Sequence, residues 1–201
     1  MGAYCPANVV DDATMRRIER EVLVPIVDVL KREDIDYRGV LYAGLMLTHA
    51  GPKVLEFNVR FGDPAVQALM VRMKAHLSEL LWRTVTSALA DADLNWDPRP
   101  SCCVVLAAEG YPGTSEKGHP IEGLDEVEAM RDVVVFHASS RRDAQGRIVT
   151  GGGRCLSVVA LGDTLADARR LANQAAERIQ FKGKVYRRDI GAGALAEASQ
   201  K

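Results

Sequence analysis

The stretch Val-Leu-Glu-Phe-Asn-Val-Arg-Phe-Gly-Asp-Pro, residues 54–64, decides how the rest of the chain is interpreted. With the two-residue period of a β-strand, its side chains separate into two faces. The apolar side chains that share one face are Leu55, Phe57, Val59 and Phe61. The polar side chains that share the other face are Glu56, Asn58 and Arg60. The pattern predicts a strand with one apolar face and one face that presents an acid, an amide and a guanidinium.

The strand runs directly into a turn that predicts the start of a helix. Asp63 is expected at the N-cap and Pro64 at the first helical position, with Gly62 permitting the tight turn. A helix N-terminus favours phosphate or carboxylate groups. The stretch therefore places a possible anion site directly after the polar strand face.

The residue types on that polar face suit a cation beside a phosphate. Glu56 and Asn58 offer hard oxygen ligands of the kind that Mg²⁺ takes, and Arg60 favours phosphate or carboxylate. The alternative interpretation is a solvated strand edge, with Arg60 in an ordinary surface ion pair. For Asp63, helix capping is by itself a sufficient explanation.

The stretch also resembles the signature of the phosphoribosylamine–glycine ligase family, which are ATP-grasp enzymes of purine biosynthesis. The resemblance covers nearly the whole chain, because five further blocks follow the family's order. These blocks are residues 1–6, 39–46, 110–113, 152–154 and 186–191. Together they are far more specific than a lone Glu-x-Asn pair.

The resemblance implies an α+β fold in which the C-terminal half of an ATP-grasp domain, antiparallel strands with helices, precedes a small α+β C-terminal domain. The expected boundaries are residues 1–94 for the partial ATP-grasp domain and 101–192 for the C-terminal domain. The proline-rich connector 95–100 lies between them, and an Ala/Gly/Ser tail, 193–201, is expected to be frayed.

The activity that the resemblance implies is ATP-dependent ligation of glycine to 5-phosphoribosylamine, which gives glycinamide ribonucleotide, ADP and phosphate through an acyl phosphate. In the family the Glu-x-Asn pair, here Glu56 and Asn58, holds Mg²⁺ or Mn²⁺ that bridges the ATP phosphates. Arg60 would contact phosphate as a catalytic residue. Asp63 and Arg154 are the remaining candidates for binding substrate or nucleotide, although the three glycines before Arg154 also fit a structural turn.

The sequence departs from the family pattern at several positions. Ala65 and Val66 replace a Glu followed by Thr or Cys, and His76 stands where an Asp is usual. Ala192 and Gly193 replace bulkier residues. Two alternatives therefore stay open: another ATP-grasp carboxylate–amine or carboxylate–thiol ligase, and a non-catalytic module derived from the ligase. We also expect this chain to be an incomplete fragment that is inactive without the N-terminal half of the enzyme as its partner.

Composition argues against some other functions. The 26 Lys and Arg balance 27 Asp and Glu, so the net charge of −1 gives no electrostatic basis for binding nucleic acid or membranes. No stretch approaches the roughly 20 apolar residues of a membrane-spanning helix. The four cysteines lack metal-ligand spacing, which favours reduced thiols and a cytoplasmic location.

Hydrophobic periodicity predicts the remaining elements. Residues 1–10 are expected to be irregular. A helix starts at Asp11 or Asp12 and is disturbed at Pro25, strand 39–47 is expected at the centre of a sheet, and strand 53–61 pairs with it in antiparallel fashion. Thr164 and Asp167 predict a capping box. The other predictions are helices between 64 and 91, strands at 102–108, 133–137, 147–150 and 154–161, and an extended segment at 185–190.

Overall fold

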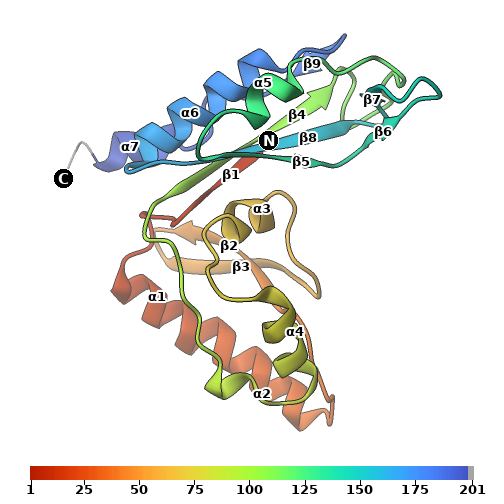
Figure 1. The fold of residues 1–201 in the computed structure, drawn as a ribbon. Helices are drawn as coiled ribbons and strands as arrows, with labels where there is room; N and C mark the ends of the chain where they lie inside the picture. The colour runs from red at the N-terminus through yellow and green to blue at the C-terminus, as the bar shows by residue number, and fades with distance from the viewer. Residues whose placement is uncertain (199–201) are drawn as a thin grey trace. The chain divides into compact units, whose positions relative to one another are not determined.

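The computed structural model of the chain describes residues 1–198 and contains two compact packing units (Figure 1). One unit combines residues 1–6 and 63–73 with the chain from residue 96 onward. The other contains residues 7–62 and 74–95. Both contain helices and antiparallel strands, so the predicted α+β class is confirmed.

The first unit is built around an antiparallel sheet. Its strands lie in the spatial order β1 (Gly2–Cys5), β4 (Ser101–Ala108), β8 (Arg154–Leu161) and β5 (Val133–His137). A short strand, β9 (Lys184–Val185), pairs with the end of β4. Strand β4 therefore has neighbours on both edges along its length.

Both faces of β4 are covered by helices. Cys102, Val104 and Leu106 belong to the hydrophobic cluster that includes the alanines of α6 (Leu165–Arg178). Cys103, on the opposite face, packs in a second cluster with Ala68 of α3 (Ala65–Met70). Every residue of β4 is buried, and after Ser101 its sequence is apolar without alternation, as expected for a central strand.

Helix α6 begins where the capping box predicts. The Thr164 hydroxyl accepts a hydrogen bond from the Asp167 backbone N–H at 3.1 Å. Ala168, Ala172 and Ala175 are fully buried, and their small side chains let the helix approach the sheet closely. The unit also contains α5 (Leu124–Glu128), the hairpin of β6 (Ser140–Arg142) and β7 (Ile148–Thr150), and α7 (Ala192–Ala198).

The second unit is a helix-flanked hairpin. Strands β2 (Tyr42–Thr48) and β3 (Gly51–Asn58) pair in antiparallel fashion, as predicted, and α1 (Asp12–Ile18) contacts β3. A π-helical turn, Glu19–Leu23, joins α1 to α2 (Val24–Arg32), with Pro25 in the first turn of α2. The predicted disturbance near Pro25 is therefore present. Helix α4 (Leu77–Val85) and a 3₁₀ turn, Leu89–Asp91, complete the unit.

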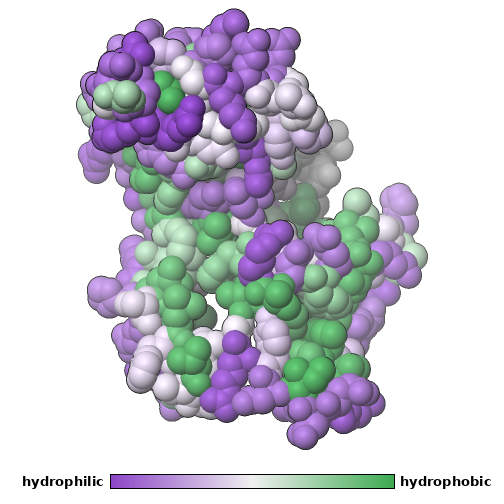
Figure 2. Space-filling model, turned by 90° about the vertical axis from the view of Figure 1, so that its right-hand side faces the viewer, coloured by the Kyte–Doolittle hydropathy of each residue, from purple (hydrophilic) through white to green (hydrophobic). Residues whose placement is uncertain are grey.

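This second unit leaves much apolar surface exposed. Among its described residues, the buried apolar side chains are Ile18 and Val22. By contrast, Leu55, Val59 and Trp82 are 64%, 74% and 68% exposed. Figure 2 shows hydrophobic residues, in green, on the surface of this unit. An apolar surface of this kind normally marks an interaction site.

Four predictions of local structure are wrong. The first residues are not irregular, because Gly2–Cys5 pairs with β4 as strand β1. The predicted strand 39–47 is not central: in residues 1–198, β2 pairs with β3 alone, and none of its residues is fully buried. The strand predicted for 53–61 ends at Asn58. The predicted extended segment 185–190 contains only the end of β9.

The predicted helix start at Asp63 is also wrong. Helix α3 begins at Ala65, its N-cap is Pro64, and no side chain caps it. Residues 193–198, expected to be frayed, lie in α7, whose alanines have high helix propensity. Residues 199–201 of that tail lie outside the described chain.

The predicted division of the chain at residues 95–100 stays a proposal. In the structure, two earlier segments, 1–6 and 63–73, also pack with the chain that follows the connector. Residues 63–73 pack with the C-terminal segment although they precede the connector by more than twenty positions. The end of the connector is fastened there too: Arg99 forms ion pairs with Asp97 at 3.0 Å and Asp132 at 2.9 Å.

The first testable prediction concerns the β4–β8 core. Leu156 of β8 is fully buried opposite Leu106, so Leu156→Ala should lower the free energy of unfolding by about 2–5 kcal/mol. Val134→Ala on neighbouring β5, at a side chain that is 44% exposed, should cost less than about 1 kcal/mol. Urea denaturation of both variants measures the difference. Equal losses would contradict the assigned core.

A second prediction concerns the thiols. Cys102, Cys103 and Cys155 are buried, and burial raises the pKa of Cys102 to about 11 and that of Cys103 to about 12. Because the thiolate is the reactive form, these cysteines should resist an aromatic disulfide reagent at about pH 8 in the native chain. Partly exposed Cys5 should react first. A rapid phase that persists in Cys5→Ala would show that the buried assignment is wrong.

Candidate functional site

The β2–β3 hairpin positions the predicted metal ligands. Gly51 closes its turn with φ +110°, a conformation that favours glycine. Further along, the register shifts at Gly44 and Leu45, so that Glu56 lies opposite Gly44 and Leu55 has no partner. A Cβ built on Gly44 would lie 3.2 Å from Glu56 Cγ. The missing side chain at Gly44 therefore makes room for the Glu56 side chain across the hairpin.

Glu56 and Asn58 lie side by side at the end of β3. The Asn58 Nδ2 donates a hydrogen bond to Glu56 Oε1 at 2.9 Å. Residues 1–198 contain no group of three His, Cys, Asp or Glu side chains that could hold a metal. A cation held here would have these two oxygen ligands from the protein, which suits Mg²⁺ because it commonly keeps waters and binds substrate phosphates.

Arg60 does not lie on the strand face with Glu56 and Asn58. It falls in a bend beyond the end of β3, and its Nη1 donates to the carbonyl oxygen of Phe61 at 3.0 Å. Its side chain is exposed and makes this local contact with its own neighbour. The prediction that three polar residues share one strand face therefore holds for two of them.

Asp63 and Arg154, 91 positions apart, lie together in the first unit. Arg154 Nη2 pairs with Asp63 Oδ2 at 3.4 Å, and Arg154 Nη1 donates to the Asp63 backbone oxygen at 3.3 Å. The same Nη1 lies 3.7 Å from Met1 Sδ. Arg154 thus contacts both the side chain and the backbone of Asp63.

The glycines before Arg154 are required by close packing. A Cβ on Gly153 would lie 2.5 Å from the ring of Tyr111, and one on Gly152 would lie 2.9 Å from Ser139. The carbonyl oxygen of Gly153 also accepts a hydrogen bond from the Ala108 N–H at 2.7 Å. Close backbone approach therefore explains Gly152 and Gly153, a structural role for these glycines.

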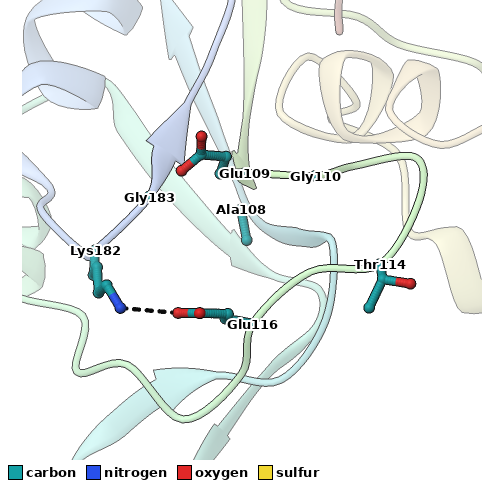
Figure 3. A pocket seen from close by; sticks show the side chains of 7 residues that line it. All are labelled: Ala108, Glu109, Gly110, Thr114, Glu116, Lys182 and Gly183. Carbon is teal, nitrogen blue, oxygen red and sulfur yellow. Dashed lines mark hydrogen bonds and ion pairs between the residues drawn. The ribbon is translucent and has the colours of Figure 1, made fainter.

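A pocket of about 300 Å³ lies at the end of β4 (Figure 3). Lys182 and Glu116 pair across it at 2.9 Å, and Glu116 also contacts His119 Nε2 at 2.9 Å. Hydrogen bonds from Lys182 and His119 lower the pKa of the Glu116 carboxyl. Figure 3 shows Glu109 on another wall, with its carboxylate directed away from this pair. Sequence reasoning assigned no chemistry to these residues.

Sequence reasoning also missed Gln67. Its Nε2 donates to Asp63 Oδ1 at 3.0 Å, so it holds the carboxylate that pairs with Arg154. The spacing of four residues was visible, but the prediction that Asp63 caps the helix assigned that carboxylate to backbone N–H groups instead.

Two family models match the chain. The model of the phosphoribosylglycinamide synthetase ATP-grasp (A) domain matches residues 1–66, and that of the C domain matches residues 101–193. Within the described residues, no helix has the length and apolar character needed to span a membrane.

Curated relatives agree with these matches. Phosphoribosylamine–glycine ligase from Rhodopirellula baltica is 48% identical over 201 residues, which are all of this chain and 46% of the relative. The ligase from Caldanaerobacter subterraneus subsp. tengcongensis is 46% identical over 194 residues, which are 96% of this chain and 45% of the relative. The chain thus spans about half the length of the curated relatives it matches.

Solved structures give the same result. A crystal structure of phosphoribosylamine–glycine ligase from Thermotoga maritima matches with a TM-score of 0.74 at 34% identity, over 94% of this chain and 46% of that one. N5-carboxyaminoimidazole ribonucleotide synthetase from the same organism matches with a TM-score of 0.59 at 18% identity, over 90% of this chain and 45% of that one, which shows the fold alone. From the two family matches, the relatives and the Thermotoga structure, we conclude that the chain belongs to the phosphoribosylamine–glycine ligase family and corresponds to part of its ATP-grasp domain together with its C domain.

Proposed function

We propose that this chain is the metal-binding and C-terminal portion of an enzyme that ligates glycine to 5-phosphoribosylamine with ATP. The observation that carries the proposal, beside family membership, is the pair of oxygen-bearing side chains at the end of β3, Glu56 and Asn58. The relatives extend over about twice this length, so the complete reaction is proposed for the full-length protein.

Glu56 and Asn58 are the proposed ligands of Mg²⁺ or Mn²⁺. Their donor chemistry fits such a cation, because a carboxylate and an amide oxygen are hard ligands and two of them leave positions for phosphate oxygens and water. A bound cation would neutralise phosphate charge during phosphoryl transfer. The hydrogen bond from Asn58 to Glu56 keeps the two side chains at one point of the strand end.

Arg60 is the proposed catalytic cation. It follows Asn58 by two residues, and its exposed side chain makes a contact that a negatively charged ligand could replace. A guanidinium pairs with phosphate through two parallel N–H donors, so Arg60 would stabilise charge on the phosphoryl group and on the acyl phosphate.

Asp63 and Arg154 are proposed to bind substrate or nucleotide as a pair. Their mutual contacts support a joint role, since a ligand that engages either residue also changes the environment of the other. The Arg154 side chain is one-third exposed, so its guanidinium can donate hydrogen bonds to a carboxylate or phosphate while it contacts Asp63.

The proposed reaction proceeds in two steps. A carboxylate oxygen of glycine attacks the γ-phosphorus of ATP, and ADP leaves. The amine of 5-phosphoribosylamine then attacks the carbonyl carbon of the acyl phosphate, inorganic phosphate leaves, and the amine loses a proton as the amide forms. The free cysteines of the described chain and the proposed metabolic activity support a cytoplasmic location.

The test uses a full-length chimera in which residues 1–201 replace the matching segment of the Rhodopirellula baltica ligase. Glu56→Gln keeps the size of the side chain but removes its charge, so turnover should fall by about 100-fold or more at fixed metal. The metal concentration for half-maximal rate should also rise. Glycine-dependent ADP release, titrated with Mn²⁺, measures both effects.

The matched control is Glu33→Gln, which makes the same change at an exposed position of the same unit. It should leave turnover and metal dependence unchanged, and circular dichroism should show that both variants are folded. Near-normal turnover in Glu56→Gln would exclude this residue as a metal ligand.

A further inference from the structure

We infer that Gln67 is a positioning residue, which orients the Arg154 guanidinium through the Asp63 carboxylate. The inference rests on the proposed function only in assigning Arg154 to substrate or nucleotide binding. All three residues belong to the same packing unit. The contacts run in order from helix α3, through the turn that precedes it, to the first residue of β8.

The two oxygens of Asp63 have different partners. Oδ1 accepts from Gln67 Nε2 at 3.0 Å, and Oδ2 pairs with Arg154 Nη2 at 3.4 Å. Because one oxygen is held by Gln67, the carboxylate cannot rotate freely about its Cβ–Cγ bond. The other oxygen therefore presents a fixed acceptor to the arginine, beside the backbone oxygen that receives Nη1.

The other end of the Gln67 amide supports this role. Its Oε1 is buried without a hydrogen-bond partner in the described structure, which is unfavourable for a polar atom. Turning the amide over would place Oε1 against the Asp63 carboxylate, where two acceptors repel each other. The orientation of the amide is therefore set by its donation to Asp63.

Two sulfur groups, those of Cys103 and Met1, lie near Asp63 or Arg154. Helix α3 packs on β1 and β4. Burial raises the pKa of the Cys103 thiol on β4, and the negative charge of nearby Asp63 raises it further. Met1 Sδ is the further contact of Arg154, at 3.7 Å. The Met1 thioether has no proton and the Cys103 thiol is a weak donor, so neither sulfur matches the amide donor of Gln67.

An ordinary glutamine–aspartate pair on a helix surface would predict something different. Such a pair contributes locally to helix stability, and its removal leaves a distant arginine unaffected. The positioning role predicts that changes at Gln67 alter Arg154, which is 87 positions away in sequence and on a different element.

The first measurement uses Gln67→Glu in the full-length chimera. Near pH 8 the introduced carboxylate repels Asp63, so kcat should fall by about 10- to 100-fold, the range expected when a binding group is misplaced. Crowding of two carboxylates raises the pKa of the pair, and near pH 6 the protonated form donates to Asp63 again. The ratio of variant to parent kcat should therefore recover about tenfold or more as the pH falls. Gln174→Glu, an exposed position on α6, is the control and should show no such recovery.

The second measurement needs no turnover and uses the 201-residue chain. With ¹⁵N-labelled arginine, NMR gives the rotation rate of the Arg154 guanidinium about its Nε–Cζ bond, and Arg154→Lys assigns the signal. Gln67→Met keeps the side-chain volume but removes the donor, so the rotation should be about fivefold faster or more, while the Arg99 signal stays unchanged. An unchanged Arg154 rate in a folded Gln67→Met variant overturns the inference.

If the parent chimera lacks glycine-dependent turnover, the proposed function fails, and the rotation rate still decides the role of Gln67.

Discussion

The burial of β4 between two helices is the constraint on which the first packing unit depends. Its alternate residues contact α6 on one face and α3 on the other, and its edges are occupied by β8 on one side and by β1 and β9 on the other. Segments from three parts of the sequence must therefore meet around one strand. At the start of β4, the buried Ser101 hydroxyl donates a hydrogen bond to the Ala68 carbonyl oxygen at 2.7 Å and so joins this strand to α3. Arg72 adds two more contacts, to the Arg99 carbonyl oxygen and to Cys5 Sγ, each at 2.8 Å.

This arrangement gives Asp63 and Arg154 their relation to one another. Helix α3 is held on β4, so the turn before it is held as well, and β8 begins at Arg154 beside the end of β4. The packing of Tyr111 and Ser139 against the glycine run then leaves little freedom in the approach to Arg154. The hairpin unit is built differently. Its cross-strand register and the space at Gly44 place Glu56 and Asn58, while most of its apolar side chains stay exposed. An apolar surface of this kind normally marks an interaction site, and the chain spans about half the length of its relatives.

Much of the fold was predictable from the sequence where local signals and packing agree. Hydrophobic patterning predicted β4 and β8 within a residue, and Thr164 with Asp167 marked the start of α6, because caps and buried strands are local features. Strand β1 was not predictable, since four residues form a strand only because β4 is there to pair with them. Apolar residues on both faces of residues 39–47 suggested a central strand, but the pattern reports what a segment can bury and not how many strands pair with it.

The candidate site was predictable to a similar degree. The pleat of a strand places Glu56 and Asn58 together wherever the strand continues, so their pairing followed from spacing. Arg60 was misplaced because the strand ends at Asn58, and the end of a strand depends on hydrogen bonds to a partner. The contact between Asp63 and Arg154 joins residues 91 positions apart, and no local signal in a single sequence predicts it.

In the proposed function, this chain supplies the metal and phosphate end of a glycine ligase, and the other half of the relatives' length supplies the remainder. The most direct test of this proposal is glycine-dependent ADP release with 5-phosphoribosylamine present, compared between the 201-residue chain and the full-length chimera. We expect the chain alone to release no ADP in response to glycine, because stabilising the transferred phosphoryl group takes donors on both of its sides and the chain spans about half the length of its relatives. We also expect the chimera to form ADP and the amide in equal amounts. Turnover by the chain alone, or a folded chimera that binds ATP and never forms the amide, would contradict the proposal.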